Sequence, residues 1–209
     1  MLSPNNYSSF LGAGYSVREL AFAFVRLKIV SWIWTHLKYP LRRRGARVCI
    51  DYTVDIAGPR FVEVGNDSWV QRYSWLTVPL IGMRLIEDRA YLSIGERVQI
   101  GRNCFIAASN RIEIADDVLL GPYVTIVDHS HCYSDHEVPV KEQGITQEGF
   151  VKIGAGAWIG AGAMVLGHRG ITIGENAVVA AHAVLTKDLP AYCVAVGNPA
   201  RIMENRNEY

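Results

Sequence analysis

Aliphatic residues recur at every sixth position along most of this chain, and the residue that follows each of them is usually small. Twelve such hexads can be written between Ile94 and Pro190, with one interruption, and nine of them carry glycine or alanine in second place. Weaker copies begin at Val64 and Val70. A period of six matches neither a 3.6-residue helix nor a simple alternating strand. It predicts a solenoid of very short strands, in which each turn buries its apolar side against the next turn.

The fifth position of most hexads is also small or β-branched. Two positions per hexad, one large and one small, can therefore point into the narrow interior of a triangular prism. Cys104 occupies such a position, so we interpret it as a small core residue and not as a reactive thiol. The residues at the fifth position are Val98, Cys104, Val118, Val124, Ala157, Ala163, Ala177 and Ala183.

The spacing of the turns predicts one irregular corner. Ile94 and Ile114 are 20 residues apart, as are Ile153 and Ile173, whereas three hexads account for only 18. The two extra residues follow the third hexad both times, and a polar loop leaves the repeat at the same point after Ile126. Residues at this corner should therefore stack from turn to turn. The register places Ser109, His129 and His168 in one column, and Asn110, Ser130 and Arg169 in the next.

A different pattern precedes the repeat. Ser16 and Glu19 have the spacing of a capping box, which predicts a helix from Val17 to Leu37 that Pro40 terminates. Such a helix has an apolar face and a polar face. The apolar face contains Leu20, Phe24, Leu27 and Trp34, and the polar face contains Lys28, Ser31 and Thr35.

Two roles fit this helix. Its apolar face could pack on the main domain, which is the interpretation that we favour, since such a face more often meets protein than lipid. Alternatively, residues 17–47 could make a peripheral contact with an anionic membrane, because Arg42, Arg43, Arg44 and Arg47 follow directly. Charges within the helix argue against a membrane-spanning segment.

Composition and length narrow the function only slightly. The 209 residues include 21 basic and 20 acidic side chains, which gives no general reason to expect nucleic acid as a partner. Four scattered cysteines and the lack of a signal-peptide pattern predict a cytoplasmic protein, with the inner face of the membrane as one location. We expect three regions: an amino-terminal segment at 1–47, the coil at 48–190 with a loop at 131–150, and a cap at 191–209.

Four motifs carry a family resemblance: G-P-Y-V-T-I-V-D-H at 121–129, V-K-I-G-A-G-A-W-I-G-A-G-A at 151–163, V-L-T-K-D-L-P at 184–190 and V-G-N-P-A-R at 196–201. With these motifs the chain resembles the hexapeptide-repeat acyltransferases, including the maltose, galactoside and polysaccharide O-acetyltransferases. The resemblance implies an all-β solenoid, a left-handed parallel β-helix, with the amino-terminal α-helix and the corner loop added.

The resemblance also implies an activity. Members of this family are trimers that bind acetyl-coenzyme A (acetyl-CoA) as acyl donor between subunits and need no metal. A histidine matching His129 removes the proton of the acceptor hydroxyl, and Asp128 could orient that ring or shape the acceptor pocket. We therefore expect a sugar O-acetyltransferase of surface polysaccharide or glycolipid synthesis. Because the amino-terminal domain of the maltose and galactoside enzymes is not recognisable here, a lipid-linked or nucleotide-linked glycan is the expected acceptor.

Other residues are expected around His129. His131, Tyr133 and Asp135 in the loop, and Ser109, Asn110 and His168 by register, are candidates for acceptor binding. Trp158, expected at a corner of the prism, could line the groove for coenzyme A. The resemblance adds Ala161, Ala181, Thr186, Lys187 and Arg201 as further residues that bind coenzyme A.

Three other functions stay open on sequence grounds. An amino-sugar N-acetyltransferase would share fold and donor. A γ-class carbonic anhydrase would bind zinc, and His131 and His136 have a suitable spacing, but the third histidine that such a site needs is missing. A β-helix without catalytic activity could serve only in assembly.

Overall fold

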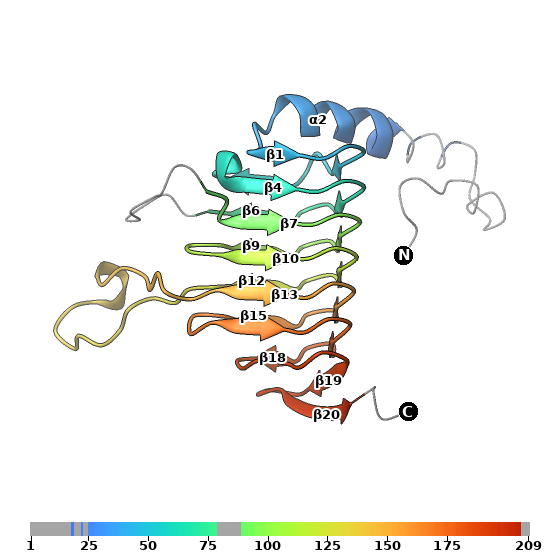
Figure 1. Cartoon of the computed structure of the whole chain (residues 1–209). Helices are drawn as coiled ribbons and strands as arrows, with labels where there is room; N and C mark the ends of the chain where they lie inside the picture. The colour runs from blue at the N-terminus through green and yellow to red at the C-terminus, as the bar shows by residue number, and fades with distance from the viewer. Residues whose placement is uncertain (1–17, 19–21, 23–24, 79–88, 206–209) are drawn as a thin grey trace.

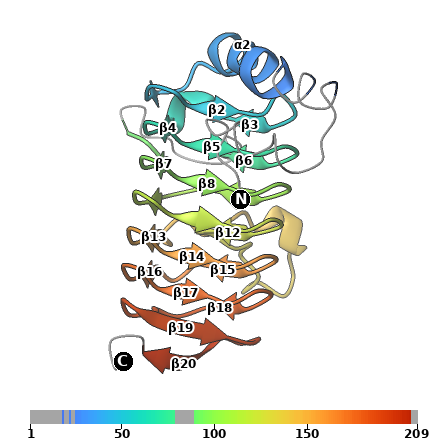
Figure 2. The ribbon, with the colours of Figure 1, turned by 90° about the vertical axis from the view of Figure 1, so that its right-hand side faces the viewer.

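Three parallel sheets, wound from one continuous coil, form the sides of a prism. The computed structural model describes residues 18, 22, 25–78 and 89–205. Figure 1 shows the turns stacked from β1 to β19, with a helix across one end and β20 at the other. Figure 2, turned by 90°, shows β14 (Trp158–Ile159) and β15 (Met164–Leu166), which belong to two of the three sheets, side by side. Short helical turns, η3 (Pro59–Phe61) and η4 (Val140–Glu142), interrupt the coil.

The strands of each sheet come from successive turns. Sheet A contains β1 (Arg43–Arg44), β4 (Val62–Val64), β7 (Leu92–Ile94), β10 (Ile112–Ile114), β13 (Val151–Ile153) and β16 (Ile171–Ile173). Sheet B contains β2 (Cys49–Ile50), β5 (Trp69–Val70), β8 (Gln99–Ile100), β11 (Leu119–Leu120), β14 (Trp158–Ile159), β17 (Val178–Val179), β19 (Cys193–Val196) and β20 (Arg201–Asn205). Sheet C contains β3 (Asp55–Ala57), β6 (Trp75–Thr77), β9 (Phe105–Ala107), β12 (Thr125–Val127), β15 (Met164–Leu166) and β18 (Val184–Leu185).

The predicted register is confirmed. Ile114 lies beside Ile94 on one side and Ile153 on the other, and Ile153 lies beside Ile173. The coil also begins before the clear repeat, because Val64 pairs with Ile94 in the same ladder. Parallel strands extend past the expected range of 48–190 at both ends, since β1 and β19 are part of sheets A and B.

The interior is filled as the hexads predict. All eight small or β-branched residues at the fifth position are buried, as are the aliphatic residues that open the hexads. Cys104 is among them, and burial raises the pKa of its thiol to about 11, so the thiol is protonated at neutral pH. A small residue just before each of these strands and a large one within it let the three sheets approach closely around a narrow core.

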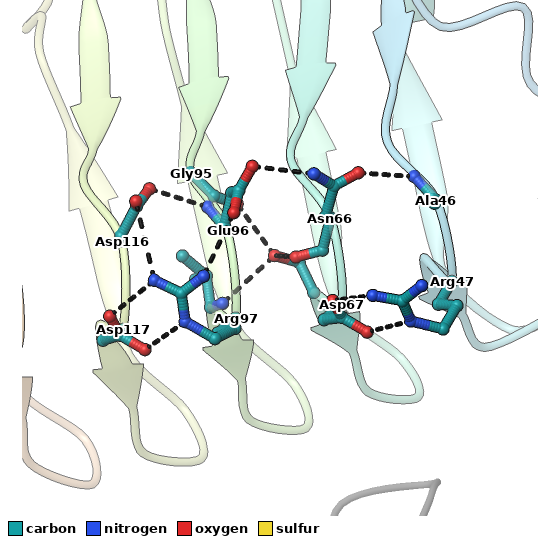
Figure 3. A network of polar contacts seen from close by, with 11 residues as sticks. Ala46, Arg47, Asn66, Asp67, Gly95, Glu96, Arg97, Asp116 and Asp117 are labelled. Atoms are coloured by element: carbon teal, nitrogen blue, oxygen red, sulfur yellow. Dashed lines mark hydrogen bonds and ion pairs between the residues drawn. The ribbon is translucent and has the colours of Figure 1, made fainter.

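Two corners of the prism are tight and regular, and Figure 3 shows part of the one between sheets A and B. Arg47 pairs with Asp67 of the next turn, with a distance of 2.5 Å between Nε and Oδ1, and Arg97 pairs with Asp117 at 2.7 Å. All four residues have positive φ, as the tight turn requires. The exposed charges thus connect equivalent positions of neighbouring turns.

The corner between sheets C and A is irregular, as expected. Four residues connect β9 to β10 and β15 to β16, but 23 residues connect β12 to β13. This longer connection is the predicted loop, which stands away from the prism in Figure 1. Its two arms pair through His131 and Ile145, and the amide of Cys132 donates to the carbonyl oxygen of Gly144.

The amino-terminal segment is helical over η2 (Val25–Val30) and α2 (Ser31–Leu37). The start of the predicted helix and the side chains of its expected packing face, Leu20, Phe24, Leu27 and Trp34, lie outside the described residues. Ser31 and Thr35, which belong to the predicted polar face, are fully buried. The hydroxyl of Thr35 accepts a hydrogen bond from the amide of Ile50 at 3.1 Å, so this part of the polar face docks on the open end of the coil.

Candidate active site

A buried carboxylate lies at the irregular corner, directly after β12. Asp128 is 0% exposed. Its Oδ1 accepts hydrogen bonds from the amide of Ser109 at 2.8 Å and from the Ser109 hydroxyl at 3.1 Å. Its Oδ2 accepts from the amides of Asn110 at 2.8 Å and Arg111 at 2.7 Å. A carboxylate can be buried only when it is bonded in this way, so the turn before β10 holds Asp128 in one position.

His129 is the residue that this carboxylate orients. Its Nδ1 lies 2.9 Å from Oδ1 of Asp128, and its side chain is 17% exposed. Among the described residues, Nε2 of His129 has no hydrogen-bond partner. An aspartate that accepts a hydrogen bond from Nδ1–H fixes the tautomer whose Nε2 carries a lone pair. The pair therefore presents a base toward solvent at the corner of the prism.

Ser109 and Asn110, which the register placed beside His129, form hydrogen bonds within the protein. Ser109 is buried against Asp128. The amide nitrogen of the Asn110 side chain donates to the carbonyl oxygen of Gly149 at 2.7 Å, at the end of the loop. These contacts fix the base of the loop, and a contact of either residue with an acceptor stays a prediction.

Gly149 and Arg89 complete the base of the loop, and neither residue was predicted from the sequence. A Cβ atom at Gly149 would collide with the carbonyl oxygen of Asp128. Nη2 of Arg89 donates to the Asn110 side-chain oxygen at 2.7 Å and to its backbone oxygen at 2.8 Å. Both residues lie outside the hexads, so periodicity could not reveal them.

A cavity of about 720 Å³ lies between the arms of the loop and the next turn of the coil. It contains three of the predicted acceptor residues, His131, Tyr133 and His168. Asp135 is not in its lining: the Asp135 carboxylate accepts a hydrogen bond from the amide of Glu137 at the exposed tip of the loop. The cavity begins at Ser130, the neighbour of His129. Its lining is Ser130, His131, Cys132, Tyr133, Ser134, Ile145, Thr146, Gln147, Glu148, His168 and Arg169.

The residues expected to bind coenzyme A are divided between two corners. Thr186 and Lys187 follow β18, so they lie on the same corner as His129, further along the coil. Ala161 and Ala181 follow β14 and β17, at the corner between sheets B and C, so sheet C separates them from His129. One chain alone does not gather these residues around its own histidine.

The two remaining candidates lie on sheet B. Trp158 is half exposed and belongs to β14, so the expectation that it occupies a corner is wrong. A residue that pairs in the ladder with Leu119 and Val178 must lie on the face of the sheet. Arg201 begins β20 and is exposed.

Comparisons with known proteins agree with the motifs. A family model described as the hexapeptide repeat of succinyl-transferase matches residues 150–187. A probable acetyltransferase of Mycobacterium tuberculosis is 41% identical over 115 residues, 55% of this chain and 37% of that protein. The galactoside O-acetyltransferase of Escherichia coli is 30% identical over 154 residues, 71% of this chain and 66% of that enzyme. The chain belongs to the hexapeptide-repeat acyltransferase family. The predicted resemblance is thereby confirmed.

This hexapeptide-repeat acyltransferase also shares its fold with solved structures. A variant of an N-acyltransferase from Bacillus cereus, in complex with dTDP and coenzyme A, superposes with a TM-score of 0.67 over 92% of this chain and 90% of that chain. The two sequences are 18% identical, so the likeness concerns the fold alone. The chain spans 37% of the length of the Mycobacterium tuberculosis protein and 66% of the length of the Escherichia coli enzyme.

Proposed function

We propose that this hexapeptide-repeat acyltransferase transfers an acetyl group from acetyl-CoA to a sugar hydroxyl, with His129 as the general base. The observation that carries the proposal is the pair of Asp128 and His129, in which Nδ1 is bound to the carboxylate, next to a cavity that begins at the neighbouring Ser130. A neutral imidazole held in this way can deprotonate a hydroxyl as it attacks. General-base catalysis of this kind contributes about 10²- to 10⁴-fold to the rate.

The reaction can proceed in a single transfer. Nε2 of His129 accepts the proton of the acceptor hydroxyl while the hydroxyl oxygen forms a bond to the thioester carbonyl carbon. The carbon–sulfur bond then breaks, the acetyl group remains on the sugar, and the imidazolium returns its proton to the leaving thiolate of coenzyme A. No nucleophilic serine or cysteine is needed. The buried Asp128 stabilises the imidazolium that exists between the two proton transfers.

The cavity beneath the loop is the proposed acceptor site. His131, Tyr133, His168 and Arg169 offer donors and acceptors around a volume of about 720 Å³, which suits one or two sugar units. The acceptor would be a nucleotide-linked or lipid-linked glycan of surface polysaccharide or glycolipid synthesis. Because acetyl-CoA is a cytoplasmic metabolite, the proposed location is the cytoplasm.

The active assembly is proposed to be a trimer of left-handed coils, in which coenzyme A lies between subunits. The separation of Ala161 and Ala181 from His129 by sheet C supports a groove that two chains share. Sheet C also has exposed apolar side chains, Trp75 and Met164, and the ring of Trp75 lies 5.0 Å from that of the partly buried Phe105. Sheet A presents a polar column instead, made of Arg43, Glu63, Ser93, Glu113, Lys152 and Thr172.

The test is an assay of thiol release from acetyl-CoA with a panel of sugar and amino-sugar acceptors, followed by mass spectrometry of the products. We expect an acetyl ester, which hydroxylamine cleaves, and a loss of about 10²- to 10⁴-fold in His129→Gln at an unchanged melting temperature. A resistant amide product would show an N-acetyltransferase instead. Turnover of His129→Gln close to that of the wild type would refute the role of His129.

A further inference from the structure

The helix that covers one end of the prism exposes an apolar stripe to solvent. Its members are between 41% and 81% exposed and follow one another at a regular helical spacing, which places them on one side of a helix. We propose that this end of the molecule binds the surface of an anionic lipid bilayer, with the helix lying in the plane of the interface. The stripe consists of Val25, Ile29, Ile33 and Leu37, at intervals of four residues along η2 and α2.

The orientation of the helix is set by its other side. Ser31 and Thr35 are fully buried, and the Thr35 hydroxyl bonds the backbone of Ile50 in the first turn of the coil. Nη1 of Arg44 donates to the carbonyl oxygen of Thr35 at 3.2 Å, near the end of the helix. Among the described side chains of the helix, Ser31 and Thr35 thus face the protein, and the aliphatic members of the stripe face outward.

Charge separates this end from the rest of the chain. Residues 1–47 contain eight Lys and Arg against one acidic residue, whereas the remaining residues contain 13 basic and 19 acidic ones. Among the part of this segment that the structure describes, Arg42 pairs with Glu63 and Arg47 with Asp67 of the coil. A positive surplus remains in this segment after those pairs are subtracted. An apolar stripe with basic residues around it is what an interfacial helix at an anionic membrane requires.

The same charge argues against the alternative occupant, a second copy of this chain stacked end to end. Such contact would bring two positively charged ends together, and like charges across an interface oppose association. The proposed contact is with the bilayer surface. Among the residues that the structure describes, no helix is long and apolar enough to cross a bilayer. An anionic bilayer can bury the apolar stripe and attract the basic residues around it.

The test is flotation of the full chain with vesicles of phosphatidylcholine alone and with vesicles that also contain phosphatidylglycerol. We expect binding to the anionic vesicles, weakened by added salt, and a loss of about tenfold or more in the double variant Ile29→Asp, Ile33→Asp. Both side chains are exposed, so circular dichroism should show an unchanged fold. Met203→Asp, at an exposed site near the other end of the prism, is the matched control and should bind as the wild type does.

Three results would overturn the proposal: no flotation of the wild type, equal binding of the double variant, or equal binding to the neutral and anionic vesicles. If light scattering instead showed an end-to-end assembly that the double variant abolishes, without vesicle binding, the stripe would be a contact between copies. Acetyl transfer to a water-soluble acceptor should be unaffected in the double variant. Failure of the membrane proposal is therefore distinguishable from failure of the proposed acetyltransferase activity.

Discussion

At the scale of single residues, Asp128 connects the stability of the coil to the chemistry of the corner. Its two oxygens accept hydrogen bonds from three backbone amides and one hydroxyl, and Oδ1 also contacts the ring of His129. The sequence predicted that Asp128 and His129 adjoin at the irregular corner. It could not predict that the carboxylate reaches Nδ1, because neighbours in a chain can point in different directions.

Asp128→Asn should lower both stability and turnover. The amide has one oxygen where the carboxylate has two, so its nitrogen would face amide donors, and a buried donor without a partner costs about 1–3 kcal/mol. The histidine would also lose the acceptor that fixes its tautomer. Denaturant unfolding and the transfer assay measure the two effects separately. His129→Gln, which leaves Asp128 and its backbone donors intact, is the control. A normal unfolding free energy in Asp128→Asn would contradict the structural part.

At the scale of elements, the hexads predict the strands of the coil, but they do not predict the path of the long loop between β12 and β13. The aliphatic residues Ile94, Ile114, Ile153 and Ile173 lie in one ladder, and the six-residue period that places them there is visible in a single sequence. The path of the loop depends on single contacts, such as that of Asn110 with Gly149, which have no period. The burial of the polar Thr35 could not be predicted for a related reason. Its hydroxyl bonds the end of a strand, and the amphipathic pattern of the helix does not reveal that single contact.

The charged corner in Figure 3 should make stability depend on pH. Hydrogen bonding to Arg97 lowers the pKa of the Asp117 carboxyl below its usual value. A carboxyl with a lowered pKa in the folded state stabilises the fold above its unfolded pKa, and this contribution is lost as pH falls through the folded pKa. Arg97→Gln should therefore be less stable than the wild type at neutral pH.

The stability difference between Arg97→Gln and the wild type should shrink as the carboxyl becomes protonated. Urea unfolding at neutral pH and at a pH below the folded pKa measures it. Added salt at neutral pH should also reduce it, because the groups are exposed. Arg102→Gln, at the neighbouring corner, is the control. A difference that stayed constant down to acid pH would mean that Arg97 acts through packing alone.

At the scale of the whole molecule, the site proposed here is incomplete in one chain. His129 projects from the corner between sheets C and A, whereas Ala161 and Ala181 follow strands of sheet B at another corner. If coenzyme A lies between subunits, a groove takes its base from one chain and its alanines from the next. Two differently damaged chains could then form an intact groove together.

Mixed trimers test this arrangement directly. His129→Gln removes the base, and Ala181→Asp would place a charge where the pantetheine arm is proposed to lie; each variant alone should be inactive. In an equal mixture that assembles at random, about one quarter of the grooves would combine an intact His129 with an intact Ala181, so activity should return to about one quarter of the wild-type value. Light scattering of each variant checks that trimers form. A mixture as inactive as its components, despite exchange of subunits, would place the whole site within one chain.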